Sequence, residues 1–376
     1  MPDGSEHREA VSGLNAAPGS LARLNQWLSA LVSLGGSDLL LVPGVAACVR
    51  VDGLLRTIEG AVLTGAEIDS AILPALAPNA LESYRRTMIA DSSYRVPGGG
   101  RFRINLHHER GQAAATIRAL PSAMPALADL RLPPEVEALA RLPRGLVLIG
   151  GPAGSGKTTT MAALIHEINR SEPRHIVTIE DPIEYEHAHL QSVVEQVEVG
   201  IDAPDFPTAL RAALRQAPDV LVIGEMRDLE TMRIAVAAAE TGHLVFSTLH
   251  TTDVASTISR ISDSFPMERQ NTIRQELAMG LSAVLTQILL PRKRGGRTPA
   301  AELLMVGYGA RQHIRRNALQ HLHQEITITK SKGSFSLEES LARLLAKGEI
   351  ERDDALLWAI HPDELNSFLR AAEVRG

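Results

Sequence analysis

The segment "GPAGSGKT", Gly151 to Thr158, has the residue types and spacing of a phosphate-binding loop, G-x-x-x-x-G-K-[ST]. An apolar run typical of a strand precedes it and a helical pattern follows, which is the context that such a loop requires. The glycines allow backbone N–H groups to surround phosphates, the Lys157 ammonium reaches the terminal phosphates, and the Thr158 hydroxyl can hold Mg²⁺. We therefore expect a nucleotide to bind at Gly151, Pro152, Ala153, Gly154, Ser155, Gly156, Lys157, Thr158 and Thr159.

Carboxylates follow two of the predicted apolar strands. "TIEDPIEYEH" carries Glu180, Asp181 and Glu184, and "VLVIGEMRD" carries Glu225. Ligands of open α/β folds bind at the carboxyl ends of the strands, where such side chains can position water and complete Mg²⁺ coordination. A carboxylate in this position is also often only a helix cap, but two clusters beside a phosphate loop favour a role in hydrolysis.

Two histidines bound the apolar strand predicted within "GHLVFSTLHT". His243 precedes the strand and His250 follows it. A single histidine is structural more often than catalytic, and the spacing alone leaves both interpretations open.

The pattern along the chain predicts two domains. Residues 1–19 are polar with scattered glycine and proline, and we expect them to form a flexible tail. An amphipathic helix followed by short strands between glycine turns indicates a small α+β domain over residues 20–120. The proline-rich residues 121–134 form the predicted linker, residues 135–300 the nucleotide-binding core, and residues 301–376 a mainly helical C-terminal region.

The fold class follows from the alternation of elements in the predicted core. Continuous apolar strands, among them "GLVLIG", "HIVTIED" and "DVLVIGE", alternate with helical segments, which is typical of a parallel sheet covered on both faces. From about Ile258 the pattern is helical apart from one strand at "AELLMV". We therefore predict an α/β core preceded by a smaller α+β domain.

The composition argues against several classes of protein. The net charge is -6, and the densest basic run, "PRKRGGR", has the features of a solvated loop, so we expect no nucleic-acid partner. The single cysteine, Cys48, cannot form an intramolecular disulfide or a multi-cysteine zinc site. We find no signal-peptide pattern and no apolar run of the roughly 18 residues that cross a bilayer. We expect a cytoplasmic protein that contacts a membrane only through partners.

Four motifs in order closely resemble those of the secretion ATPase superfamily, the hexameric motors of type II and type IV secretion and of type IV pili. "GPAGSGKT" is similar to the family's Walker A motif, "TIEDPIE" to its Asp box, "VLVIGEMRD" to its atypical Walker B motif and "GHLVFSTLHT" to its His box. The resemblance runs from about Leu24 to about Leu369 and is greatest to the twitching-motility, or pilus-retraction, branch. It implies a RecA-like P-loop NTPase core with an N-terminal PAS-like domain and C-terminal helices.

The resemblance also implies roles for residues of the core. Glu184 is expected to be the general base that aligns water. Glu225 takes the Walker B role at Mg²⁺, partly through water, together with Thr158. His243 and His250 are expected to support or sense the γ-phosphate of ATP.

Two arginines of the N-terminal domain complete the implied site. Arg103 and Arg118 match arginines that, in relatives, reach the γ-phosphate from the PAS-like domain. A guanidinium on a movable domain binds ATP better than ADP, so hydrolysis would change the orientation of that domain.

By the same resemblance the protein is a Mg²⁺-dependent ATPase that forms a homohexamer. Its expected place is the cytoplasmic side of the inner membrane, at the base of a pilus or secretion machine. Its expected partner is the inner-membrane platform protein of that machine, and the movement that it drives is movement of protein.

Two departures from the family leave the biological role open. The retraction branch carries a C-terminal motif, usually Ala-Ile-Arg-Asn-Leu-Ile, and the matching stretch, Gly309 to Ile314, reads "GARQHI", in which only Arg311 and Ile314 agree. Leu40 stands where relatives commonly have His. Pilus retraction is the leading expectation, and an accessory retraction motor or a motor of a specialised type IV secretion or conjugation system is compatible with both changes. A small-molecule kinase, a nucleotide-dependent scaffold and a nucleic-acid translocase are the alternatives from other classes.

Overall fold

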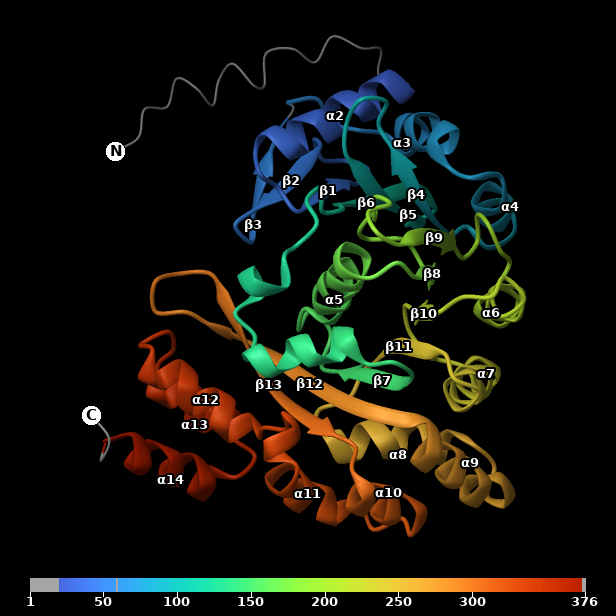
Figure 1. The fold of residues 1–376 in the computed structure, drawn as a ribbon. Coiled ribbons are helices and arrows are strands. Elements are labelled where there is room, and N and C mark those ends of the chain that lie inside the picture. Colours follow the sequence, from blue (N-terminus) through green and yellow to red (C-terminus); the bar gives the residue numbers. More distant parts are fainter. Residues whose placement is uncertain (1–19, 59, 374–376) are drawn as a thin grey trace. The chain divides into compact units, whose positions relative to one another are not determined.

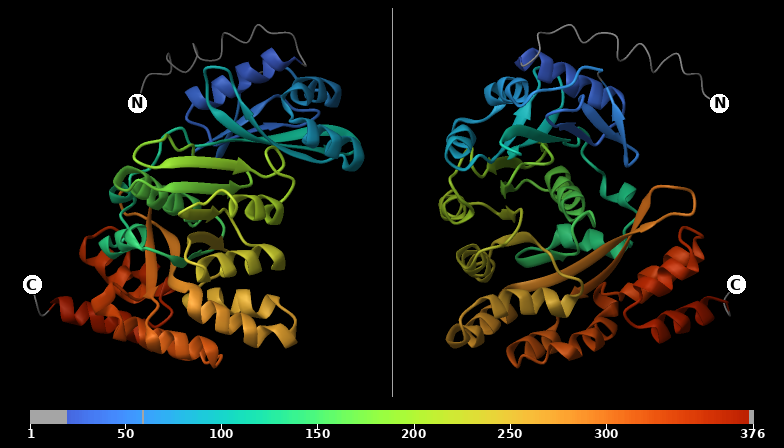
Figure 2. Two further views of the ribbon diagram at one scale, coloured as in Figure 1. Left: turned by 45° about the vertical axis from the view of Figure 1, so that its right-hand side comes forward. Right: turned by 180° about the vertical axis from the view of Figure 1, so that it is seen from behind.

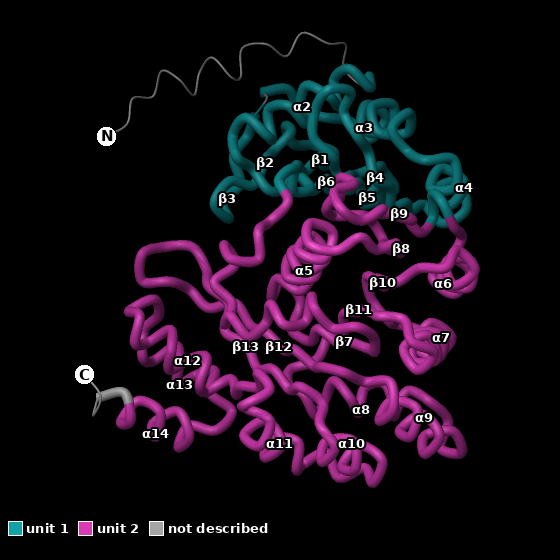
Figure 3. Tube along the Cα trace, in the orientation of Figure 1, with its two compact units in different colours: residues 1–123, 200–202 teal, residues 124–199, 203–376 magenta. Residues whose placement is uncertain are grey.

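The computed structural model describes residues 20–58 and 60–373. The chain divides into two compact units, residues 1–123 with 200–202 and residues 124–199 with 203–376 (Figure 3). The predicted tail, residues 1–19, lies outside the described residues. Among the described helices, none is both long enough and apolar enough to cross a lipid bilayer.

The first unit is built on an antiparallel sheet of six strands in the order β3-β2-β1-β6-β5-β4 (Figure 1). Its strands are β1 Asp38–Leu41, β2 Cys48–Val51, β3 Leu54–Thr57, β4 Ala90–Arg95, β5 Arg101–Glu109 and β6 Gln112–Ala119. Its helices are α2 Leu21–Ser33, α3 Gly65–Ile72 and α4 Pro78–Thr87. Helices and sheet share one apolar core, which confirms the predicted α+β character.

Helix α2 shows how local sequence sets an element of this unit. The Ser20 hydroxyl accepts a hydrogen bond from the backbone N–H of Arg23 at 3.2 Å, which satisfies one of the free donors at the helix start. Leu24 and Leu28 recur at helical spacing and are completely buried in the core. Gly35, at φ 63°, adopts the left-handed conformation that follows many helix ends.

The second unit contains a sheet of seven strands in the order β13-β12-β7-β11-β10-β8-β9. Neighbouring strands are parallel except for β12 and β13, which pair antiparallel. This arrangement confirms the α/β core. The strands are β7 Gly145–Gly150, β8 His175–Glu180, β9 Val193–Glu198, β10 Val220–Ile223, β11 Leu244–Leu249, β12 Leu281–Pro291 and β13 Arg297–Met305.

Both faces of this sheet are covered, because alternate side chains of each strand enter different cores. On β7, Leu146 and Leu148 belong to one core and Val147 and Ile149 to another. Figure 2 shows α5 on one side of the sheet and α8 to α11 on the other. The helices are α5 Lys157–Ser171, α6 Phe206–Ala213, α7 Leu229–Glu240, α8 Val254–Ser264, α9 Met267–Gly280, α10 Tyr308–Arg315 and α11 Leu322–Ile328.

The C-terminal helices pack on the far ends of β12 and β13 around a further core. They are α12 Leu337–Ala346, α13 Arg352–Trp358 and α14 Pro362–Glu373. The basic run "PRKRGGR" forms the turn between β12 and β13, where Arg292 pairs with Glu349 at 2.7 Å and Lys293 with Glu351 at 3.0 Å. Two of its cations are therefore neutralised within the chain.

The prediction that the pattern is helical from about Ile258, apart from one strand, was wrong for residues 281–291. These residues form the 11-residue strand β12, which pairs with β7 and β13. A continuous apolar run suits a buried strand and a buried helix equally well, so periodicity could not separate them. Residues 281–291 form a strand because β7, which precedes the phosphate loop, needs a hydrogen-bonding partner on the side away from β11, and β12 pairs with its backbone there.

The altered C-terminal motif "GARQHI" lies on α10. Arg311 donates to the carbonyl oxygens of Ala278 and Met279 at the end of α9, at 2.7 Å for the second, and Ile314 is completely buried. The two residues that agree with the family motif therefore join α10 to α9 and to the core. A Cβ atom on Gly309 would lie 2.6 Å from Cδ of Glu325 on α11, so the departure to glycine makes room for this carboxylate.

We expect Gly309→Ala to lower the free energy of unfolding by about 1 kcal/mol, because the added methyl group displaces the end of the buried Glu325 side chain from its contact with His313. Urea unfolding of the two proteins measures this loss. The double variant Gly309→Ala/Glu325→Ala should be as stable as Glu325→Ala alone. Equal stability of Gly309→Ala and the wild type would contradict this packing argument.

Candidate nucleotide site

The phosphate loop joins the buried strand β7 to the start of α5. Gly156 precedes the helix at φ 88°, a conformation that residues with a Cβ rarely adopt. A Cβ atom on Gly151, at φ 152°, would collide with the backbone oxygen of Gln287 on β12. These two glycines therefore allow the backbone to wrap close to a phosphate group at the N-terminus of α5.

Lys157 is buried at the centre of this loop, with 7 % of its surface exposed. Its Nζ atom donates to the carbonyl oxygens of Gly151 and Pro152, each at 2.9 Å. Burial lowers the pKa of the Lys157 ammonium, and the carboxylates of Glu225 and Glu184 act in the opposite direction. Both predicted carboxylates thus lie close enough to act on the cation that would bind the phosphates.

His250 joins Lys157 to Glu225. Its Nδ1 atom lies 3.5 Å from Nζ of Lys157, and its Nε2 atom lies 3.8 Å from a carboxylate oxygen of Glu225. Burial and the nearby ammonium lower the pKa of His250, which favours a neutral ring that can accept from Lys157 through Nδ1. Glu225 also pairs with Arg227 at 2.6 Å. The structure brings Lys157, Glu225 and His250 into one cluster.

The loop that follows β8 carries Glu184 next to this cluster. Glu180, at the end of β8, is buried and accepts a hydrogen bond from the Thr178 hydroxyl at 2.7 Å. Burial raises the pKa of Glu180, opposed by this bond and by a backbone hydrogen bond from Glu184. The Tyr185 hydroxyl lies 3.1 Å from the Thr159 hydroxyl in the first turn of α5. The loop is thereby fixed beside the phosphate loop.

His243 does not join this cluster. β11 runs parallel to β7 with Leu244 opposite Gly145 and Leu249 opposite Gly150, so His243 lies at the start of the strand and the phosphate loop at its end. Six residues of strand separate the two ends by about 20 Å. The ring Nδ1 of His243 lies 3.0 Å from the carbonyl oxygen of Ala238 at the end of α7. This placement argues against the expected γ-phosphate contact within one chain.

Arg103 and Arg118 are direct neighbours across β5 and β6 in the first unit. Arg118 pairs with Asp38 at 2.9 Å and Arg103 with Asp91 at 3.6 Å. Burial alone would raise the pKa of the Asp38 carboxyl. Hydrogen bonds from Ser37 and Arg118 outweigh burial and lower this pKa. The arginine side chains remain 68 % and 44 % exposed, so each is held by a surface ion pair rather than buried.

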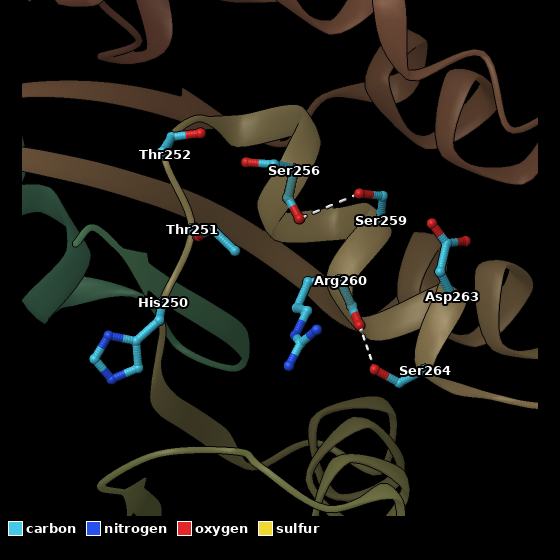
Figure 4. A pocket seen from close by; sticks show the side chains of 8 residues that line it. All are labelled: His250, Thr251, Thr252, Ser256, Ser259, Arg260, Asp263 and Ser264. Carbon is cyan, nitrogen blue, oxygen red and sulfur yellow. Dashed lines mark hydrogen bonds between the residues drawn. The ribbon is translucent and has the colours of Figure 1, made fainter. Parts of the chain in front are cut away.

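A polar groove of about 500 Å³ begins at His250 and follows α8. Figure 4 shows the side chain of Arg260 extending from α8 toward the segment that carries His250. Arg260 is exposed and has no ion pair within residues 20–58 and 60–373. Hydroxyl groups dominate the rest of the lining, which includes Thr251, Thr252, Ser256 and Ser259.

The sequence analysis missed two polar side chains that support the site from β12 and β13. The amide nitrogen of Gln287 donates to the backbone oxygen of Ser155 in the phosphate loop at 2.6 Å. Glu302 accepts from the backbone N–H of Val254 at the start of α8, at 3.2 Å, and lies 3.4 Å from the hydroxyl of Thr286. The only sequence signal is that each polar residue interrupts an otherwise apolar strand.

The motifs that form this site lie in a segment that matches a known family. The family model for "Type II/IV secretion system protein" matches residues 85–325, which include the phosphate loop and all three motifs that follow it. The chain belongs to the type II/IV secretion system protein family. Within this family it falls in the pilus-retraction branch, and it is an ATP-hydrolysing enzyme.

Relatives of this secretion ATPase include proteins of Pseudomonas aeruginosa and Neisseria gonorrhoeae. It is 40 % identical over 321 residues to the type IV pilus retraction ATPase PilT of Pseudomonas aeruginosa, an alignment that covers 85 % of this chain and 93 % of the relative. It is 38 % identical over 308 residues to a twitching motility protein of Neisseria gonorrhoeae, which covers 82 % of both chains.

A solved structure of the pilus retraction motor PilT with bound ADP resembles the fold of this secretion ATPase. The TM-score is 0.84 and the sequence identity 39 %, with 92 % of this chain and 99 % of the other covered. The likeness confirms the RecA-like core with its N-terminal α+β domain.

We expect Glu302→Gln to increase stability at high pH. Burial raises the pKa of Glu302 to about 7, with Glu338 and Asp253 acting in the same direction and His323 against them. The unfolded carboxyl titrates near 4.5, so the wild type loses stability as pH rises from about 4.5 through 7, by on the order of 3 kcal/mol.

The variant cannot ionise, so its unfolding free energy should exceed that of the wild type at pH 8 and equal it near pH 5. Urea unfolding at the two pH values measures the difference. Glu268→Gln, which changes an exposed carboxylate on α9, is the matched control and should leave the pH dependence unaltered. A pH-independent effect of Glu302→Gln would contradict the raised pKa.

Proposed function

We propose that this secretion ATPase is the Mg²⁺-dependent motor that retracts a type IV pilus and drives twitching motility. It works as a homohexamer on the inner-membrane platform protein, at the cytoplasmic base of the pilus. The observation that carries the proposal is the cluster of Lys157, Glu184, Glu225 and His250 around a phosphate loop, in a chain 40 % identical to a pilus retraction ATPase.

In the proposed reaction, each group of the cluster has one task. Lys157 exchanges its two loop carbonyl contacts for oxygens of the β- and γ-phosphates. These oxygens carry the negative charge that balances a buried ammonium. Glu184 aligns a water molecule opposite the leaving ADP and accepts a proton from this water molecule. His250, as a neutral ring beside Lys157, responds to the presence of the γ-phosphate.

Mg²⁺ would be held by the Thr158 hydroxyl and, partly through water, by Glu225, and it would neutralise charge on the phosphates. No cluster of three or more His, Cys, Asp or Glu side chains suited to a metal occurs among the described residues. A hydroxyl and one carboxylate fit Mg²⁺ well, since this ion usually keeps water and phosphate oxygens as its other ligands.

Arg103 and Arg118 are the proposed link between chemistry and movement. The Arg103 pair with Asp91 is exposed and contributes only about 0–1 kcal/mol, so Arg103 can leave this partner for a γ-phosphate at little cost. Asp38 is buried, but it keeps the Ser37 hydroxyl and Arg50 as partners when Arg118 moves. Loss of that phosphate would release the PAS-like domain, for which we propose residues 20–120, with a linker at 121–134.

The proposal is tested by light scattering and ATP turnover on the same purified sample. We expect a particle of six chains that hydrolyses ATP with Mg²⁺ and needs neither an acceptor molecule nor DNA. Turnover that requires a small-molecule acceptor would instead indicate a kinase, and strong stimulation by DNA with a steep salt dependence would indicate a translocase. In the native cell, loss of the protein should leave pili assembled but abolish twitching. Loss of secretion or conjugation with normal twitching would favour the other machines.

Glu184→Gln should retain ATP binding and lose most hydrolysis, by about 100-fold or more in kcat, because the amide cannot accept the proton of the attacking water. Nucleotide titration and steady-state turnover separate the two effects. Glu186→Gln, which changes an exposed carboxylate in the same loop, is the control and should keep wild-type turnover. Unchanged kcat in Glu184→Gln would remove Glu184 as the base.

A further inference from the structure

The edge strand β9 contacts the loop that carries Glu184 through two side chains of one face. Gln196 and Glu198 are two residues apart and therefore point to the same side of the strand. The Gln196 side-chain oxygen accepts from the backbone N–H of His187 at 2.7 Å, and a Glu198 carboxylate oxygen accepts from the backbone N–H of Ile183 at 3.2 Å. The loop is thus bound to β9 on both sides of Glu184.

Gln196 makes further contacts that use the other end of its amide. Its Nε2 atom donates to the backbone oxygen of Tyr185 at 2.9 Å and to the buried carboxyl of Glu180 at 3.2 Å. The amide orientation is fixed, because one end meets an N–H group and the other meets two oxygen atoms. One side chain therefore joins the end of β8 to two positions of the loop.

The same loop is attached to the phosphate loop helix on its opposite side, where the Tyr185 hydroxyl lies 3.1 Å from the Thr159 hydroxyl. Glu180, the other partner of Gln196, also takes part in a backbone hydrogen bond with Glu184. A shift of the backbone at Glu184 would therefore break hydrogen bonds. Those at risk are the bonds of Gln196 to the neighbouring loop residues and the bond between Glu184 and Glu180, which Gln196 also contacts.

We propose that Gln196 is a positioning residue for ATP hydrolysis, which holds the loop of residues 181–187 so that Glu184 meets the attacking water. The inference rests on the proposed role of Glu184 as the base. Gln196 acts on the rate rather than on nucleotide affinity, because its partners are the end of β8 and the base-carrying loop, and none belongs to the phosphate loop. Displacement of a reacting group by about 1 Å can cost on the order of 100-fold in rate.

The test is Gln196→Leu, which keeps the approximate shape of the side chain and removes all three hydrogen bonds. We expect kcat to fall by about 10-fold or more, while the KM for ATP and the affinity for a non-hydrolysable ATP analogue stay within about twofold. The control is Glu195→Gln, an exposed change on the other face of β9, which should keep wild-type kcat and KM. Circular dichroism and the assembled mass establish that each variant is folded. Weaker analogue binding in proportion to lost turnover, or unchanged kcat, would overturn the proposal.

A second variant pair separates this inference from the role of Glu184. If Gln196 acts through Glu184, the double variant Gln196→Leu/Glu184→Gln should have the kcat of Glu184→Gln alone. Multiplied losses in the double variant would show that Gln196 acts elsewhere, and this would overturn the inference while leaving the base intact. Wild-type turnover in Glu184→Gln would refute the base itself, whatever Gln196→Leu does. Should Gln196→Leu fail to fold, Tyr185→Phe, which removes only the hydroxyl contact to Thr159, should lower kcat with unchanged affinity.

Discussion

The buried ammonium of Lys157 sets the conditions for the rest of the second unit. A cation with so little exposure needs oxygen partners, and in this structure two loop carbonyls provide them, while the charges of Glu225 and Glu184 act on the ammonium without direct contact. The loop, the carboxylates and His250 must therefore be brought together from different parts of the chain. The parallel sheet meets this condition, because the ends of β7, β8, β10 and β11 lie along one edge.

Polar side chains inside the apolar layers hold the loops of this edge in position. Gln287 contacts the phosphate loop, Glu302 the start of α8, and Gln196 the loop after β8. Each donates or accepts at least one hydrogen bond to the loop that it contacts, although the side-chain oxygen of the buried Gln287 has no partner among the described residues. These residues come from β12, β13 and β9, the strands that flank β7, β11, β10 and β8. The edges of the sheet thereby orient loops whose functional residues lie elsewhere in the sequence.

The C-terminal motif departs from the family pattern as a packed set rather than as isolated changes. Gly309 leaves space for the Glu325 carboxylate, and His313 on the next turn of α10 lies 3.5 Å from the same carboxylate. Arg311 and Ile314, which agree with the family, bind α9 and the core. Two of the changed positions, Gly309 and His313, thus lie against one carboxylate of α11, while the two that agree with the family bind α9 and the core.

The sequence by itself determined the phosphate loop, the carboxylates at strand ends and the two classes of fold, because each depends on a short pattern of residue types. Ser20 caps the first helix, and Lys157 follows the glycine loop, for reasons that lie within a few residues of each. Only the tertiary structure decided that residues 281–291 form a strand and that His250, but not His243, joins the cluster. It also gave Gln287 its partner Ser155, which lies 132 residues away along the chain. Contacts over such distances depend on strand order and register, and no local pattern of residues carries that information.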